Sequence, residues 1–232
     1  MPSLLEIYNL SFRHPDGTQA LNDISFQLRE GEELAIFGPN GSGKTTLLLH
    51  MNGILRGEGT IRVEGLEISS RNIGEIRRRV GLVFQNADEQ LFMPTVLEDV
   101  MFGPLNLGFT AAIAEEKARH ALAQVGIGDE LLNRPPFHLS AGEKRRVALA
   151  GVLVMEPKLL LLDEPTTSLD PPGQRALLEL LRRVPQPKLI ATHDVHFASS
   201  LSERALFLDK GRLVADGPLE EIVNRFDWRL RS

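Results

Sequence analysis

The chain has 232 residues, of which 42% are hydrophobic and 25% charged, a balance typical of a globular protein with a substantial buried core. Its 26 basic and 31 acidic residues give a formal net charge of -5, which offers no basic face for wrapping nucleic acid, so we expect no nucleic-acid partner. The absence of cysteine excludes disulfides, thiolate zinc sites and cysteine-ligated iron–sulfur clusters.

We do not expect the chain to enter a membrane by itself. The N-terminal sequence MPSLLEIYNLSF lacks the charged start and long apolar core of a signal peptide. The best apolar runs, residues 148–155 and 159–162, are far shorter than the roughly 20 apolar residues that a membrane-spanning helix requires. Any role at a membrane should therefore come through a partner protein.

The first third of the chain predicts strands followed by a glycine-rich loop and a helix. Alternating apolar residues predict half-buried strands over residues 4–10 and 21–28, and the turn residues His14 to Gly17 between them predict an antiparallel hairpin. The apolar run 34–37 predicts a buried strand that leads through GPNGSGKTT into a helix over residues 45–51. Further strands are predicted over residues 60–63 and 80–84, the second ending at Gln85.

The middle of the chain, from Asn86 to about Leu139, changes to helical spacing interrupted by prolines and glycines, which predicts a helical insertion. Its predicted helices cover residues 95–101, 111–125 and 129–133, with breaks at Pro94, Pro104, Gly126, Pro135 and Pro136. Ser140-Ala141-Gly142-Glu143 then fits the S-x-x-E capping box, in which a serine and a glutamate bind the free amides of a helix start. We therefore expect a helix to start near Ser140.

The last third of the chain predicts a parallel sheet. Short apolar runs at residues 159–162 and 188–192 are separated by a predicted helix over residues 173–183, which is the pattern of a βαβ unit. Residues 206–208 and 212–215, with a glycine at the turn between them, predict a late hairpin.

The glycine-rich loop Gly38-Pro39-Asn40-Gly41-Ser42-Gly43-Lys44-Thr45-Thr46 is a complete P-loop between a predicted buried strand and a helix start. Its glycines let backbone amides curl around a β-phosphate, Lys44 can reach the β- and γ-phosphates, and the Thr45 hydroxyl can ligate Mg²⁺. The alternative is a glycine-rich turn that only connects the strand to the helix, but Lys44 and Thr45 would then have no role. We therefore predict that residues 38–46 bind a nucleotide.

Two carboxylates, Asp163 and Glu164, follow the apolar run 159–162 at the end of a predicted strand, where open α/β sheets bind ligands. Asp163 is predicted to hold Mg²⁺, and Glu164 to take a proton from an attacking water. Neighbours on a strand point to opposite faces, so both can serve one site only if the chain turns here, and Pro165 favours a turn. A solvated Asp-Glu loop is the alternative.

Gln85 and His193 also follow predicted strands. The Gln85 amide can orient water or complete the Mg²⁺ shell, and the His193 imidazole can bind a γ-phosphate. His193 and His196 have the look of a metal pair, but without a third group of ligands nearby we predict no metal there. Each residue alone would more often be structural, and their common position at strand ends favours a catalytic role.

The helix start at Ser140 is a second candidate phosphate site, because a helix start offers free N–H donors and a partial positive charge. A serine hydroxyl has one donor and two acceptor lone pairs, so Ser140 can accept from the Glu143 amide and still direct its proton at a phosphate oxygen. Gly142 has no side chain that would block a phosphate, and the Glu143 carboxylate can turn back to the Ser140 amide. Capping and phosphate binding are therefore compatible.

In order and spacing, these motifs make the chain resemble the ATP-binding cassette ATPases over essentially its whole length. GPNGSGKTT resembles the Walker A motif, LLLLDEP the Walker B motif and LSAGE the family signature. Ser168-Leu169-Asp170 resembles the D-loop, Gln85 the Q-loop and His193 the switch histidine. Residues 85–108 and 139–153 are most similar to the ATPases of energy-coupling factor importers, including the cobalt and nickel type.

The resemblance implies a single α/β domain over residues 1–232, built as a P-loop NTPase core with a mixed sheet. The core and its antiparallel β subdomain would occupy residues 1–85 and 150–232. The inserted helical subdomain, which carries the signature, would occupy residues 86–149.

The resemblance also implies a head-to-tail dimer with an identical or similar ATPase subunit, enclosing two ATP molecules with Mg²⁺. The signature Ser140-Ala141-Gly142-Glu143 of one chain would meet the γ-phosphate held by Lys44 of the other, Asp170 would lie across the interface, and Glu164 would act as the base. Integral membrane subunits would contact residues 88–90, for which an exposed acidic helix start is the alternative reading. The chain would then lie at the cytoplasmic face of the membrane as a peripheral subunit.

Two features depart from the family pattern. Ala141 and Glu143 replace the glycine and glutamine of LSGGQ, and energy-coupling ATPases tolerate such changes, so we expect activity to remain. His14, in SFRHPDG, stands where the family commonly has a tyrosine that stacks on adenine. An imidazole can also stack, with less area, and a simple turn residue is the alternative for His14.

The function that the resemblance implies is the ATPase subunit of an importer for a transition-metal ion such as cobalt or nickel, or for a vitamin. The first alternative is a soluble ATP-binding cassette protein of DNA repair or translation, which would have a second P-loop or long heptad-bearing arms that this sequence lacks. The second alternative is a P-loop kinase, which would leave the signature helix and His193 without a role.

Overall fold

The computed structural model describes residues 3–228, which form two compact units. Within the described residues, the first unit contains residues 3–82, 158–164 and 185–228, and the second contains residues 83–157 and 165–184. The predicted division into residues 1–85 with 150–232 and a helical subdomain of residues 86–149 stays a prediction, because contacts within one chain do not define parts that fold or move independently.

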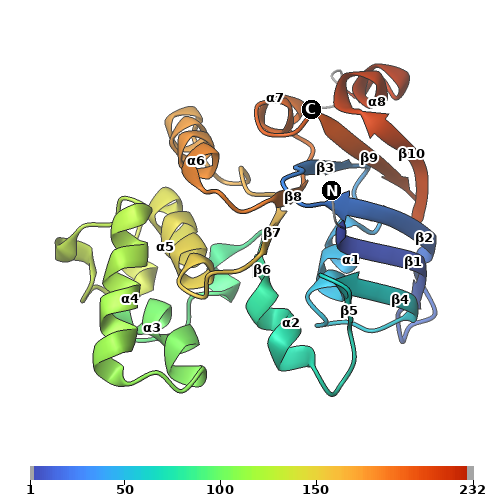
Figure 1. Ribbon diagram of the computed structural model, residues 1–232. Coiled ribbons are helices and arrows are strands. Elements are labelled where there is room, and N and C mark those ends of the chain that lie inside the picture. The colour runs from blue at the N-terminus through green and yellow to red at the C-terminus, as the bar shows by residue number, and fades with distance from the viewer. Residues whose placement is uncertain (1–2, 229–232) are drawn as a thin grey trace. The chain divides into compact units, whose positions relative to one another are not determined.

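A four-stranded antiparallel sheet in the first unit has the strand order β2-β1-β4-β5 (Figure 1). Its strands are β1 (Ser3–Arg13), β2 (Gln19–Arg29), β4 (Glu58–Val63) and β5 (Leu66–Glu67). The predicted hairpin of β1 and β2 is confirmed, and its turn is closed by a 2.9 Å hydrogen bond from the Gly17 amide to the His14 carbonyl. The two-residue strand β5 was not predicted, because two residues are too short to show an alternation.

A six-stranded sheet in the same unit has the order β10-β9-β3-β8-β7-β6. Its strands are β3 (Leu34–Phe37), β6 (Val80–Val83), β7 (Leu159–Asp163), β8 (Lys188–Ala191), β9 (Arg204–Asp209) and β10 (Arg212–Pro218). The predicted parallel pairing of β7 and β8 and the predicted hairpin of β9 and β10 are confirmed. The carboxyl ends of the parallel strands β3, β7 and β8 therefore meet at one edge of the sheet.

Four helices complete the first unit: α1 (Lys44–Met51), α2 (Ile73–Arg79), α7 (Val195–Ser199) and α8 (Leu219–Arg225). Only α1 was predicted, and the other three span five to seven residues each, too few to show a helical period. Helices α7 and α8 bury apolar side chains such as Val195 and Val223 against Phe37 of β3 and Phe207 of β9. Helices α7 and α8 thus form a packed core with β3 and β9 of the sheet.

The second unit contains α3 (Val96–Asn106), α4 (Ala111–Gln124), α5 (Ala141–Leu153) and α6 (Pro171–Arg183), of which α3, α4 and α5 pack together. The predicted helix α4 and the predicted start of α5 are confirmed. The predicted break at Pro104 is wrong, since α3 continues through this residue and gives up only the one hydrogen bond that proline cannot donate. Residues 129–133 were predicted to be a helix, but only a single 3₁₀ turn forms at Asp129–Leu131.

None of the helices within residues 3–228 is both long enough and apolar enough to span a lipid bilayer.

Candidate active site

The P-loop, residues 38–46, joins the end of β3 to the start of α1 at the carboxyl edge of the six-stranded sheet. Two of its glycines are required by close contacts. Gly38 has φ of 150°, and a Cβ there would lie 2.2 Å from the Leu208 carbonyl oxygen. Gly43 has φ of 104°, and a Cβ there would lie 2.6 Å from the Ala20 carbonyl oxygen. The loop can therefore pass this close to β9 and β2 only without side chains at these positions.

The Lys44 ammonium group lies inside its own loop. Lys44 is 7% exposed, and its Nζ donates to the carbonyl oxygens of Gly38 at 2.8 Å and Pro39 at 3.4 Å. Burial lowers the pKa of Lys44, and the neighbouring charges of Glu164 and Asp163 oppose that shift. The structure thus places a buried cation at the mouth of the loop, within 3.8 Å of Glu164 Oε1.

Asp163, the last residue of β7, meets the first turn of α1. The Thr45 hydroxyl donates a 2.7 Å hydrogen bond to Asp163 Oδ2, and Asp163 is buried. A hydroxyl beside a carboxylate is a pair of hard oxygen donors of the kind that Mg²⁺ prefers, so these residues fit the predicted ion. Among residues 3–228, no cluster of three or more His, Cys, Asp or Glu side chains that could hold a metal ion forms.

Glu164 turns out of the strand that Asp163 ends. Its φ is 43°, a left-handed value that is uncommon for a residue other than glycine, and its amide donates a 2.8 Å hydrogen bond to the Ala191 carbonyl. The predicted turn at this position is confirmed: Asp163 contacts Thr45, and Glu164 lies beside Lys44. Two neighbours that would point to opposite faces of a strand therefore face the start of the same helix.

His193 follows β8 and holds the Glu164 carboxylate. Glu164 Oε2 accepts hydrogen bonds from the His193 amide at 3.2 Å and from the ring Nδ1 at 2.8 Å. Because a carboxylate can only accept, Nδ1 is the donor of this hydrogen bond. The His193 side chain is 54% exposed, which leaves the ring accessible from solvent while the carboxylate below it is buried.

Helix α5 begins with the predicted capping box. The Ser140 amide donates to Glu143 Oε2 at 2.8 Å, and Ser140 Oγ accepts from the Glu143 amide at 3.3 Å. In this structure the Ser140 hydroxyl donates to Glu143 Oε2 at 2.7 Å, because the carboxylate that caps the amide lies within reach. The direction of this proton toward a phosphate oxygen stays a prediction. These hydrogen bonds from Ser140 lower the pKa of Glu143. Ser140 and Ala141 are exposed, and the space beside Gly142 is open.

The remaining predicted residues lie in the second unit, apart from His14. The Gln85 side chain is exposed, whereas its backbone carbonyl is bound by Arg145. Asp170 is exposed and caps α6, since its Oδ1 accepts a 2.9 Å hydrogen bond from the Gly173 amide. The structure therefore brings Lys44, Thr45, Asp163, Glu164 and His193 together in the first unit, and the second unit holds Gln85, the signature and Asp170.

His14 is tied to the P-loop helix through two rings that sequence reasoning missed. Its imidazole packs edge-on against Phe12 at 5.0 Å between centroids, and Phe12 packs in the same way against His50 of α1 at 4.6 Å. His50 is buried, and its Nδ1 lies 2.7 Å from the Thr46 carbonyl oxygen. The backbone of the half-buried His14 thus closes the β1–β2 turn, and its ring is linked through Phe12 to His50 of the P-loop helix α1. The sequence gives little signal for this contact, because Phe12 and His14 are close neighbours but His50 lies far along the chain.

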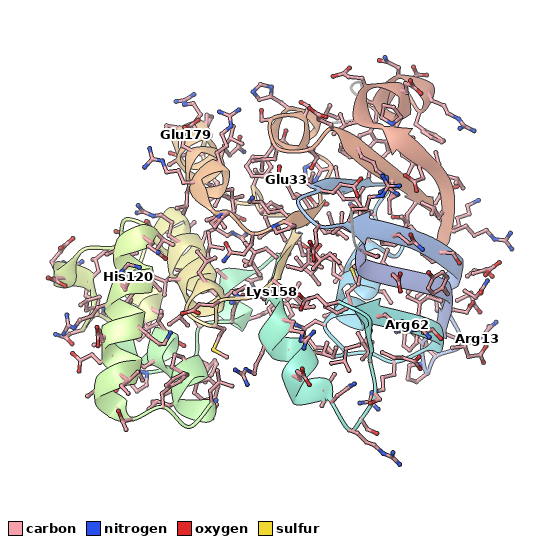
Figure 2. All side chains as sticks on the ribbon, in the orientation of Figure 1. Arg13, Glu33, Arg62, His120, Lys158 and Glu179 are labelled. Atoms are coloured by element: carbon pink, nitrogen blue, oxygen red, sulfur yellow. The ribbon has the colours of Figure 1, made fainter. Side chains whose placement is uncertain are left out.

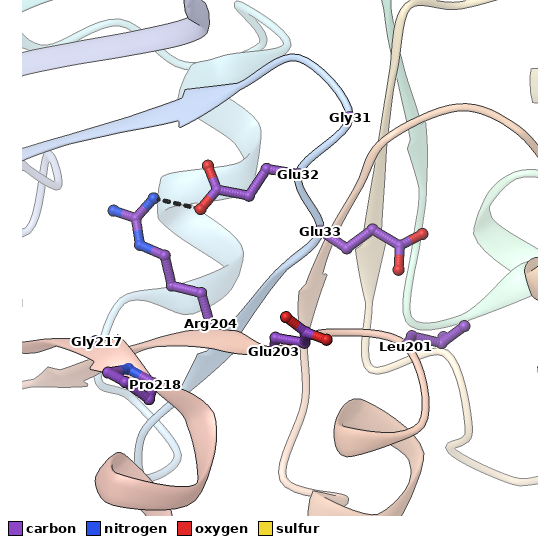
Figure 3. A pocket seen from close by; sticks show the side chains of 8 residues that line it. All are labelled: Gly31, Glu32, Glu33, Leu201, Glu203, Arg204, Gly217 and Pro218. Carbon is purple, nitrogen blue, oxygen red and sulfur yellow. Dashed lines mark hydrogen bonds and ion pairs between the residues drawn. The ribbon is translucent and has the colours of Figure 1, made fainter. Parts of the chain in front are cut away.

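A cavity of about 710 Å³ lies elsewhere in the first unit, lined by residues that include Glu32, Glu33 and Arg204 (Figure 3). Residues 31–33 precede β3, so this cavity is at the amino end of the strand, opposite the P-loop. Three of its charged residues form ion pairs: Glu33, labelled in Figure 2, accepts from Lys188 at 2.6 Å, and Arg204 pairs with Glu32 at 2.9 Å. These ion pairs favour a structural role for this part of the cavity wall.

The sequence is similar to known proteins over nearly its full length. A family model described as ABC transporter matches residues 21–167. A Streptomyces coelicolor protein named for ABC-transporter ATP binding is 50% identical over 227 residues, which cover 97% of this chain and 87% of the relative. The energy-coupling factor transporter ATP-binding protein EcfA of Methanothermobacter thermautotrophicus is 45% identical over 240 residues, which cover 98% of this chain and 76% of the relative.

Solved structures share the fold. The structure of cbiO1 from Clostridium perfringens, part of the ABC transporter complex cbiONQ, aligns with a TM-score of 0.84 at 36% identity and covers 100% of this chain and 94% of that one. A dimeric ATP-binding cassette in a post-hydrolysis state bound to ADP and Pi aligns with a TM-score of 0.82 at 26% identity, covering 93% of this chain and 98% of that one.

Proposed function

The chain belongs to the ABC transporter family of ATP-binding proteins and is an ATPase, and from this premise we propose that it powers a membrane importer of the energy-coupling factor type. The proposal is supported by the 45% identity to an energy-coupling factor ATPase over 98% of the chain. We further propose that the imported solute is a transition-metal ion such as cobalt or nickel, or a vitamin, because cbiO1 of the cbiONQ complex has the same fold at 36% identity.

The observation that carries the catalytic proposal is the convergence of Asp163 and Glu164 on the start of α1. In our proposal, water attacks the γ-phosphorus of ATP in line, the bond to the β–γ bridging oxygen breaks, and a proton of the water passes to the Glu164 carboxylate. The hydrogen bond from His193 fixes that carboxylate at the end of β8. The products are ADP and inorganic phosphate, which balances the reaction.

The P-loop backbone and Lys44 would bind the phosphates, with the ammonium exchanging its two carbonyl partners for phosphate oxygens. Thr45 and Asp163 would hold Mg²⁺, with Gln85 as a further ligand or a guide for water. When bound there, Mg²⁺ neutralises charge that develops on the phosphate oxygens. His14 would stack on the adenine, which its ring contact through Phe12 to the P-loop helix supports.

We propose that the signature, residues 140–143, binds the γ-phosphate in trans within a head-to-tail dimer. Exposure of Ser140 and the open space beside Gly142 support this, because within residues 3–228 a Cβ at Gly142 would have no atom within 4 Å. The Ser140 proton, now donated to Glu143, would have to turn to the phosphate on dimerisation. Asp170 would lie across the same interface, and the second subunit would be identical or a similar ATPase.

The membrane subunits would contact the segment that follows Gln85. Asp88 and Glu89 are exposed in a single 3₁₀ turn, and they are followed by Phe92, which is 63% exposed and packs edge-on against Phe102 of α3 at 4.9 Å. An exposed aromatic pair beside acidic groups suits a partner that presents apolar and basic side chains. The chain would thereby lie at the cytoplasmic face of the membrane as a peripheral subunit.

The alternative is a cassette ATPase of DNA repair or translation that is not coupled to transport. Copurification separates the two: the tagged chain, expressed in its own cell, should bring integral membrane proteins with it in mild detergent, and these should bind the imported solute. Recovery of the chain only with nucleic acid or ribosomes would support the alternative.

Glu164→Gln tests the catalytic proposal. Because the amide cannot take a proton, the variant should bind Mg-ATP but hydrolyse it about 10²- to 10⁴-fold more slowly. ATP then persists, so light scattering should detect a dimer in Mg-ATP and a monomer without nucleotide. A variant that stays monomeric at high protein and nucleotide concentration would argue strongly against the trans site.

A further inference from the structure

Arg145 lies one turn after the signature on α5 and is only 4% exposed. Its Nη1 donates to the Phe84 carbonyl and its Nη2 to the Gln85 carbonyl, both at 2.6 Å. Nη2 also lies 3.5 Å from the Thr167 carbonyl oxygen. One buried side chain of the signature helix therefore holds two successive carbonyls of the Q-loop.

Two further contacts join the same pair of segments. Gln90 Oε1 accepts a 3.2 Å hydrogen bond from the Phe84 amide, and its Nε2 donates a 3.0 Å bond to the Ala148 carbonyl of α5. Lys144, beside Arg145, pairs with Asp88 at 2.6 Å. Residues 84–90 are thus attached to α5 at both ends, and all of these residues belong to the second unit.

The guanidinium group suits this position for a chemical reason. It is planar, always charged and carries donors in a fixed fork, so it can hold two neighbouring carbonyls at a defined angle. A lysine ammonium is a single flexible point charge and would hold one carbonyl at a time. The fork therefore fixes the orientation of the Gln85 peptide as well as its distance from α5.

We propose that Arg145 is a positioning residue that locks the Q-loop to the signature helix, so that Gln85 and Ser140 move as one body. The proposal rests on the proposed function, in which Gln85 and the signature both serve hydrolysis. A membrane subunit that displaces residues 88–92 would therefore also displace the signature, because the buried Arg145 connects the two segments.

A double-mutant cycle on ATP hydrolysis tests this inference. Gln85→Ala and Arg145→Lys should each lower kcat, by on the order of 10- to 100-fold, because the catalytic amide is removed in one and misplaced in the other. The double variant should be no slower than the slower single variant, since both substitutions disrupt the same group. In Arg145→Lys, the KM for Mg-ATP should stay close to that of the unsubstituted chain, because the P-loop belongs to the other unit.

Arg146→Lys is the matched control. Arg146 is the next residue on α5, but its guanidinium binds the Gly126 carbonyl at 3.2 Å instead of the Q-loop. We expect Arg146→Lys to leave the effect of Gln85→Ala at its full size. An unchanged kcat in Arg145→Lys, or effects of Arg145→Lys and Gln85→Ala that multiply, would overturn the proposal.

Hydrogen exchange separates the lock from the proposed function. In Arg145→Lys, and in Arg145→Met where that variant folds, amides of residues 84–90 should exchange at least tenfold faster while those of residues 38–46 keep their rates. Unchanged exchange over residues 84–90 would overturn the lock. If Gln85→Ala leaves kcat for ATP hydrolysis unchanged, the proposed role of Gln85 is wrong. The hydrogen-exchange measurement alone then decides whether Arg145 locks residues 84–90 to α5.

Discussion

At the scale of single residues, Glu164 depends on a backbone conformation that most residues avoid. A left-handed φ of 43° costs a non-glycine residue about 1–3 kcal/mol and persists only where the surroundings fix it. Here the Ala191 carbonyl binds its amide and His193 binds its carboxylate. The conformation places a second carboxylate beside Lys44, which a regular strand could not do.

Glu143 gives a pH-dependent prediction. Its pKa in the folded chain is below the ordinary 4.5, so its stabilising contribution is complete above that pH and is lost as the pH falls through the lowered pKa. Glu143→Gln keeps a capping side chain without charge and should lower the free energy of unfolding by about 0.3–1 kcal/mol at pH 7. Urea unfolding at a series of pH values should show the two proteins converging in strong acid. A difference that is constant over all pH values would contradict this assignment.

Gly43→Ala tests whether the P-loop needs its close approach to β2. The added methyl group would lie 2.6 Å from the Ala20 carbonyl oxygen, so we expect a loss of about 1–3 kcal/mol in stability together with weaker ATP binding. Gly65→Ala is the matched control, because Gly65 also has a positive φ, of 76°, but has no atom within 4 Å of the new Cβ. ATP titration should show normal affinity for Gly65→Ala. Equal affinities for the two variants would contradict the packing argument.

At the scale of elements, the sequence was most informative where a run of residues repeats one pattern. The strands with continuous apolar or alternating residues, the P-loop and the capping box at Ser140 could all be predicted, because each depends on neighbours in sequence. The short helices α2, α7 and α8 could not be predicted. They form through contacts with distant strands, and each spans less than two full turns. The helix through Pro104 shows the same limit, because tertiary packing outweighed one missing hydrogen bond.

The candidate site divides in the same way. Lys44, Thr45, Asp163 and Glu164 could be assigned from motifs at strand ends, and their contacts agree with that placement. The role of Arg145 could not be assigned from the sequence. Arg145 is one of three successive basic residues in KRR, and only the folded structure shows that it is the buried one. The hydrogen bond from the Ser140 hydroxyl to Glu143 could not be predicted for a similar reason, because the choice between a phosphate and the Glu143 carboxylate depends on distance, which a sequence does not contain.

Gly142→Asp separates the stability of α5 from its proposed partner contact. A Cβ at this position would have open space around it among residues 3–228, and an acidic group in the first turn of a helix is favourable by about 0.3–1 kcal/mol. We therefore expect an unchanged or slightly higher melting temperature but loss of hydrolysis, because the carboxylate would repel the γ-phosphate of the other chain. Thermal unfolding and phosphate release measure the two effects. Normal hydrolysis in this variant would contradict a signature that contacts phosphate.

At the scale of the whole molecule, the predicted site residues divide between the two units of the chain. The first unit holds the P-loop, Asp163, Glu164 and His193, and the second holds an exposed helix start with a bare glycine and an exposed Asp170. Ser140 is exposed while Glu164 and Lys44 are buried, and our proposal is that a second chain completes the site. The relatives known as dimers in solved structures have the same fold.

Mixing two inactive variants tests the trans signature most directly. Lys44→Ala chains should fail to hold the phosphates, and Gly142→Asp chains should present a repulsive signature, so neither should hydrolyse ATP alone. In a mixed head-to-tail dimer, the intact P-loop of the Gly142→Asp chain meets the intact signature of the Lys44→Ala chain. Our account predicts that phosphate release appears on mixing. A mixture as inactive as its separate components, at a concentration where the unsubstituted chain is active, would contradict it.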